Sequence, residues 1–138
     1  MTRARQYLPT VNLDAALARS AIAKATRERF ENLLDFQLKA AGVDSFERQY
    51  RFIEGRKFSA DFAWPRYRLA VEVQGGIWRK GGGAHSHPTM IERDIEKIQV
   101  GLTNGWAILP VTSDQVKRGE ALRVIMAVID QRAVNASP

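Results

Sequence analysis

The feature that most restricts the fold is a series of three short alternating segments in the middle of the chain. Apolar or aromatic side chains alternate with polar ones in residues 49–53, 57–63 and 67–74. A period of two predicts β-strands, because successive side chains of a strand point to opposite faces. Residues 54–56 and 65–66 provide short connections, which favour an antiparallel meander of the three strands.

A helix-forming segment precedes the predicted strands. Residues 14–41 are rich in Ala, Leu, Arg and Glu and contain neither Pro nor Gly, and Gly42 is a natural C-terminal stop. A helix of more than about 25 residues is unusual in a small domain, so a break near Ser20 is an alternative. The apolar residues that recur at helical spacing are Phe30, Leu33, Leu34, Leu38 and Ala41.

The C-terminal part of the chain predicts a helix, a strand and a closing helix. Thr89 and Glu92 have the spacing of a capping box, and Gly105 ends the helix that they open. Residues 106–111 predict a short apolar strand, and residues 113–132 predict the closing helix. The helix that Thr89 opens has an apolar stripe that is expected to be buried, made of Ile91, Ile95, Ile98 and Leu102. The closing helix carries Leu122, Ile125, Met126 and Ile129. The predicted order is α-β-β-β-α-β-α, an α/β fold.

Length and composition indicate one domain with one hydrophobic core. The 138 residues are 45% apolar, which is enough to bury such a core. Residues 1–13 predict a flexible basic arm, and residues 14–138 predict a single domain. The chain has no apolar run of bilayer length and no signal peptide, so we expect a cytoplasmic protein without a membrane partner. It has no cysteine, which excludes disulfides, thiolate nucleophiles and zinc sites built on cysteine.

The chain is also strongly basic. Lys and Arg outnumber Asp and Glu by 21 to 15, which gives a net charge of +6 and a pI near 10.1. Such a charge on a small domain suits a polyanionic partner such as DNA. The alternative is a basic protein with no such partner.

Two carboxylates stand in segments that otherwise look buried. Asp61 lies among alanine and phenylalanine residues, and Glu72 lies between two valines before a glycine pair. A charge there is costly unless it is paired or bound to a metal. Pairing through the turn at Pro65 brings both carboxylates to one face of neighbouring strands, where Mg²⁺ or Mn²⁺ would offset their repulsion. The alternative is a structural salt bridge with Arg66 or Arg68.

Two longer stretches carry a resemblance to a known family. The first is RKFSADFAWPRYRLAVEVQGG, and the second, after a loop with Gly and His, is ERDIEKIQVGLTNGWAILPVT. Together they resemble the PD-(D/E)XK nuclease superfamily, within it small phage and prophage endonucleases related to the very-short-patch repair endonuclease. The likeness runs from about Glu31 to Val124. It implies a restriction-endonuclease-like core, in which helices flank a mixed central sheet in the order α-β-β-β-α-β.

The resemblance assigns roles to the residues of the motif. Asp61 and Glu72 match the two acidic residues that bind the metal, Mg²⁺ or Mn²⁺. Gln74 stands where the motif has a lysine, and the resemblance implies that Lys97 on the following helix takes over its task. That task is to position the attacking water or to stabilise the pentavalent phosphate.

Further residues receive secondary roles. Glu31 matches an acidic residue of the first helix that contacts the metal through water, although an ion pair with neighbouring cations is an alternative. Asp94 matches a recurrent helix carboxylate, although it is also spaced to pair with Lys97. His85 is expected to contact a phosphate or protonate the leaving oxygen. His85 and His87 are alternatively loop residues without a role, since zinc lacks a third ligand there.

The function implied is a Mg²⁺-dependent DNA endonuclease. A homodimer would suit branched DNA such as a Holliday junction, and a monomer would suit nicking at mismatches. The alternative is a catalytically inactive DNA-binding or interaction module with a nuclease fold, which the glutamine at position 74 favours. Trp78 is a candidate to stack on a distorted or unpaired base, although burial is the commoner fate of a tryptophan, and Trp64 is expected in the core. The expected DNA-backbone contacts are Arg3, Arg5, Arg19, Lys24, Arg27, Arg29, Arg79 and Lys80.

Overall fold

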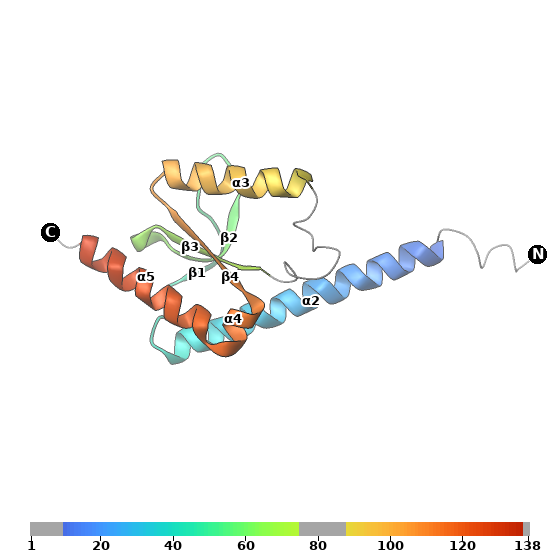
Figure 1. The fold of residues 1–138 in the computed structure, drawn as a ribbon, viewed down its shortest axis with the longest axis horizontal. Coiled ribbons are helices and arrows are strands. Elements are labelled where there is room, and N and C mark those ends of the chain that lie inside the picture. Colours follow the sequence, from blue (N-terminus) through green and yellow to red (C-terminus); the bar gives the residue numbers. More distant parts are fainter. Residues whose placement is uncertain (1–9, 75–87, 137–138) are drawn as a thin grey trace, which may run out of the picture.

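The computed structural model describes residues 10–74 and 88–136 (Figure 1). They form an α/β fold in which helices flank a four-stranded mixed sheet, as the sequence predicts. The elements are α2 (Thr10–Ala40), β1 (Glu47–Arg51), β2 (Ser59–Trp64), the 3₁₀ turn η1 (Pro65–Tyr67), β3 (Leu69–Gln74), α3 (Pro88–Thr103), β4 (Ala107–Thr112), α4 (Ser113–Arg118) and α5 (Glu120–Ala136).

The sheet has the order β1-β2-β3-β4. The first three strands form the predicted antiparallel meander, and β4 lies parallel to β3 after the crossover through α3. Phe62 lies opposite Val71, which fixes the register of β2 and β3. The third strand begins later than predicted because η1 forms a tight turn and Arg68 adopts a left-handed backbone (φ 49°).

The main core lies on the face of the sheet that α2, α4 and α5 cover. Leu34 and Leu38 of α2 are fully buried against Phe62 and Val71 of the sheet. Trp64 belongs to the same cluster and is 1% exposed, so its predicted place in the core is confirmed. The opposite face of the sheet is covered by α3 (Figure 1).

Helix α2 is longer than predicted and continuous. It begins at Thr10 instead of residue 14 and runs for 31 residues without a break near Ser20. The sequence has no Pro or Gly between Pro9 and Gly42, so nothing interrupts helix propagation. The N-terminal half projects past the rest of the molecule (Figure 1), and Leu17 is 60% exposed there. Despite this length, no helix in the described ranges is both long and apolar enough to cross a membrane.

The prediction that the apolar stripe of α3 is buried is wrong. Three of its members, Ile95, Ile98 and Leu102, are 50%, 42% and 62% exposed. The opposite side of α3 meets the sheet instead, through Lys97 and Gly101. A Cβ atom on Gly101 would lie 2.5 Å from the Ile108 side chain of β4, so glycine permits this close approach.

The predicted closing helix is two helices. Gly119 separates α4 from α5 with a left-handed backbone (φ 78°), a conformation that costs glycine little. Ile125 of α5 is fully buried, while Leu122 and Ile129 are partly buried against the main core. Met126 is 36% exposed.

Candidate active site

One cleft brings together the predicted catalytic residues that the structure describes. It has a volume of about 640 Å³ and is lined by α2, the first three strands and α3. The predicted catalytic residues in its lining are Glu31, Asp61, Glu72, Gln74, Asp94 and Lys97. Seven further predicted residues lie outside the described residues: Arg3, Arg5, Trp78, Arg79, Lys80, His85 and His87.

Asp61 and Glu72 are neighbours because of the β2–β3 register. Phe62 pairs with Val71, and one step further along the same register places Asp61 opposite Glu72. Asp61 Oδ2 accepts a hydrogen bond from the backbone N–H of Val73 at 2.8 Å. The carboxylate of Asp61 is therefore fixed at the point where the regular pairing of the two strands ends.

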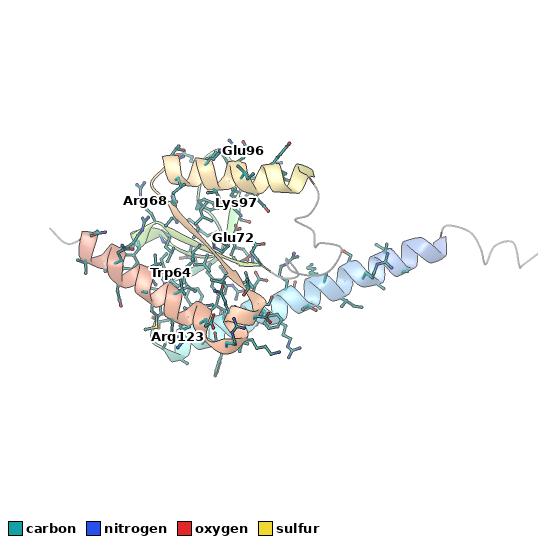
Figure 2. All side chains as sticks on the ribbon, in the orientation of Figure 1. Trp64, Arg68, Glu72, Glu96, Lys97 and Arg123 are labelled. Carbon is teal, nitrogen blue, oxygen red and sulfur yellow. The ribbon has the colours of Figure 1, made fainter. Side chains whose placement is uncertain are left out.

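Glu72 and Lys97 form an ion pair between the sheet and α3 (Figure 2). Their side chains are only 15% and 16% exposed. Lys97 Nζ also donates to the carbonyl oxygen of Ser59 at 2.6 Å, and Gln74 Nε2 lies 3.4 Å from the second oxygen of Glu72. Burial lowers the pKa of Lys97, and the negative charge of Asp61 opposes this change. Contact with the Glu72 carboxylate further favours the charged ammonium.

Glu72 therefore forms a salt bridge, which was the predicted alternative to a metal, but its partner is Lys97 instead of Arg66 or Arg68. Arg68 instead donates to the carbonyl oxygen of Asn104 at 2.8 Å, at the end of α3. Arg66 lies over the ring of Tyr67, 5.4 Å from its centroid. Neither arginine lines the cleft.

Glu31 is a buried carboxyl group beside Asp61. Its residue is only 4% exposed, and Gln49 Nε2 donates to its Oε1 atom at 3.1 Å. Burial raises the pKa of Glu31 to about 7, and a hydrogen bond with Asp61 and the charge of Asp61 add to this increase. The charge of Arg48 and the hydrogen bond from Gln49 act in the opposite direction. Glu31 is thus a proton-exchanging group near neutral pH instead of a surface ion-pair residue.

Basic side chains lie at the α2 side of the cleft. Lys24 and Arg27 belong to its lining, and Lys24 lies 4.0 Å from Glu28 across an exposed helical turn. Arg29 is not part of the lining and lies over the ring of Phe30 at 5.8 Å. The predicted DNA contacts of α2 thus divide into two residues beside the cleft and two, Arg19 and Arg29, outside its lining.

Sequence reasoning missed several residues of the cleft. Arg48 and Gln49 of β1, Ser59 of β2 and Asn32 of α2 all line it. The register would have identified Gln49, because β1 and β2 pair Arg48 with Phe62 and Tyr50 with Ala60, which leaves position 49 opposite Asp61. Ser59 contributes its carbonyl oxygen, for which the side chain gives no signal.

The donor set of the cleft fits a hard divalent cation. Within residues 10–74 and 88–136, no three His, Cys, Asp or Glu side chains converge as a metal cluster. Mg²⁺, however, is commonly held by one or two carboxylates together with water and substrate phosphate. Asp61 and Glu72 supply such a pair on adjacent strands, and each carboxylate oxygen has more than one lone pair.

Comparison with known proteins finds similarity over part of the chain. No family model matches the chain, and no solved structure matches it. Two curated proteins from two strains of Mycobacterium tuberculosis, with the titles "Uncharacterized protein MT2308" and "Uncharacterized protein Rv2248", are each 34% identical over 64 residues. The matched region is 46% of this chain and about a fifth (21%) of the length of each relative.

Proposed function

We propose that this chain is a metal-dependent DNA endonuclease with the restriction-endonuclease-like core of the PD-(D/E)XK superfamily. The observation that carries the proposal is the cleft. Six residues chosen from the sequence for one chemistry come from α2, β2, β3 and α3, and all six line the same cleft. Residues selected for unrelated structural reasons would have no cause to converge in this way.

The proposed reaction is hydrolysis of a phosphodiester bond. A divalent cation held by Asp61 and Glu72 would supply Lewis-acid charge for the attacking water and the phosphorane. Asp61 is suited to this role because the Val73 N–H fixes one of its oxygens. Glu72 is suited because it lies opposite Asp61 and keeps its carboxylate within the cleft.

The neighbouring side chains supply positioning and proton transfer. Lys97 holds an ammonium group beside Glu72, where it can orient a water molecule or stabilise negative charge on the phosphate. Gln74 can orient the same water through its amide. Glu31, with a pKa of about 7, can accept or release a proton at its carboxyl group near neutral pH.

The proposed substrate is DNA, bound at the side of the cleft where α2 contributes two cations. Lys24 and Arg27 would contact backbone phosphates there, and the projecting half of α2 extends this surface away from the catalytic residues (Figure 1). Such contacts position the substrate without reading its sequence. A homodimer would present two clefts for a branched substrate such as a Holliday junction, and a monomer would nick one strand at a mismatch.

A cleavage assay tests the proposal. The chain is incubated with a supercoiled plasmid and a synthetic four-way junction in Mg²⁺, Mn²⁺ or EDTA. We expect cleavage with either metal and none with EDTA. Asp61→Asn and Glu72→Gln should abolish cleavage while DNA binding is retained, and Asp44→Asn, at an exposed site outside the cleft, is the matched control. Full activity of either cleft variant would show that the site is assigned wrongly.

One observation favours an inactive DNA-binding module as the second candidate. Glu72 is already neutralised by Lys97, and position 74 has an amide where the motif has a cation. An inactive module would bind the junction with equal affinity in Mg²⁺ and EDTA and would cut neither substrate. Metal-dependent product formation by the wild type, lost in Asp61→Asn, excludes this second candidate.

A further inference from the structure

Gln49 occupies an unusual backbone conformation inside β1. Its φ angle is 48°, in the left-handed region that residues other than Gly, Asn and Asp rarely adopt. The regular pairs on either side are Arg48 with Phe62 and Tyr50 with Ala60, so the pairing is interrupted at Gln49 and Asp61. A strained residue of this kind persists only where its surroundings require it.

The side chain of Gln49 connects the two acidic residues at the α2 side of the cleft. Its Nε2 atom donates to Glu31 Oε1 at 3.1 Å and lies 3.4 Å from Asp61 Oδ1. An amide nitrogen has two hydrogens, one for each carboxyl group. Asp61 and Glu31 come from different elements, β2 and α2, and their charges repel. The amide of Gln49 offsets this repulsion and holds both groups toward the cleft.

We propose that Gln49 is a positioning residue that orients Asp61 for divalent-cation binding and holds Glu31 beside it. The inference rests on the proposed metal site and adds to it a residue that touches neither metal nor substrate. Glycine at position 49 would adopt this backbone at little cost. The glutamine instead retains a strained backbone together with an amide that reaches both carboxyl groups, which indicates that the amide is what the position requires.

The expected effect follows from the behaviour of groups that orient metal ligands. Removal of such a partner commonly weakens metal affinity by about 10-fold to 100-fold. The contact between Gln49 and Asp61 is long, at 3.4 Å. We therefore expect the metal affinity to fall by about tenfold, at the lower end of this range. Because Gln49 is exposed, its removal leaves no buried cavity, and the fold should be retained.

The test is Mn²⁺ binding by isothermal titration calorimetry, without DNA, on the wild type and Gln49→Gly. Gly relieves the backbone strain and removes the amide, so the variant should be at least as stable in urea yet bind Mn²⁺ about tenfold more weakly. Gln49→Asn keeps tolerance of the left-handed backbone, but its shorter amide cannot reach both carboxyl groups, so it should also weaken binding. Glu47→Gln, exposed on the same strand, is the matched control and should bind as the wild type does.

Cleavage measurements separate positioning from a purely structural role. Gln49→Gly should need about tenfold more Mg²⁺ for half-maximal cleavage and should approach wild-type turnover at saturating Mg²⁺. Wild-type or tighter Mn²⁺ affinity in both Gln49 variants overturns this inference and leaves the proposed function intact. A wild type that binds no Mn²⁺ and cuts no DNA overturns the proposed function as well.

Discussion

Replacement of Glu31 by glutamine should stabilise the protein, although Glu31 is buried and hydrogen bonded. Burial and the neighbouring Asp61 raise the pKa of Glu31 from its ordinary 4.5 to about 7. Between these two pH values the unfolded chain ionises at Glu31 while the folded protein keeps its proton. The folded state is therefore favoured below pH 4.5, and this advantage is lost as the pH rises through about 7.

The magnitude follows from linkage. Each pH unit across this window lowers the free energy of unfolding by about 1.36 kcal/mol, so the total loss is roughly 3 kcal/mol above pH 7. Glutamine at position 31 cannot ionise. Its amide oxygen can still accept the hydrogen bond from Gln49, and its amide nitrogen can donate a hydrogen bond to Asp61. Glu31→Gln should therefore be more stable than the wild type by roughly 3 kcal/mol at pH 8 and of similar stability at pH 4.

Urea unfolding in EDTA at pH 4, 6 and 8, followed by tryptophan fluorescence, measures this difference. With an m-value of about 2 kcal/mol/M, the midpoint of Glu31→Gln should exceed that of the wild type by about 1.5 M at pH 8. Glu28→Gln is the matched control, because Glu28 is an exposed residue on the same helix. Its stability should change by less than about 0.5 kcal/mol at each pH. No gain for Glu31→Gln at pH 8, or an equal gain at pH 4, would refute the reasoning.

Three further predictions concern the core, the ion pair and α3. Leu38→Ala should lower the free energy of unfolding by about 2–5 kcal/mol in urea, whereas Leu17→Ala, at a site 60% exposed, should change it by less than about 1 kcal/mol. Lys97→Met leaves the Glu72 carboxylate without its cation and should cost about 1–3 kcal/mol in EDTA, and an unchanged urea midpoint would show that the pair contributes nothing. Ile98→Ser should lower the free energy of unfolding by less than about 1 kcal/mol, because this side chain is 42% exposed. A decrease of more than about 2 kcal/mol would indicate that the apolar stripe of α3 is buried in the folded protein.

The sheet and the pair of carboxylates could be predicted because both follow from a period of two. The turn at Pro65 is short, so the alternation of the two flanking strands leaves little freedom in their register. The alternation predicts that Asp61 lies beside Glu72, and the observed pairing of Phe62 with Val71 confirms this register. The same local pattern says nothing about backbone angles, and the left-handed conformation of Gln49 has no counterpart in the sequence.

The orientation of α3 could not be predicted from its own residues. Helical periodicity shows which side chains share a face, but the partner surface decides which face is buried. The sheet presents the small side chains of Ala63 and Ala70 together with Glu72 toward α3. Lys97 and Gly101 complement that surface in charge and size, so they meet the sheet while the isoleucine stripe faces outward.

Because Lys97 lies on α3, the charge in the cleft depends on the packing of this helix against the sheet. A lysine at position 74 would be attached to the same strand as Glu72, and its distance from that carboxylate would be fixed by the backbone of β3. Lys97 is attached to α3 instead, so the ammonium lies at Glu72 only when α3 is packed on the sheet. The close approach at Gly101, one helical turn from Lys97, sets this packing. Charge at the cleft and docking of α3 are therefore coupled, because burial of the helix and the pairing of Glu72 depend on the same contact surface.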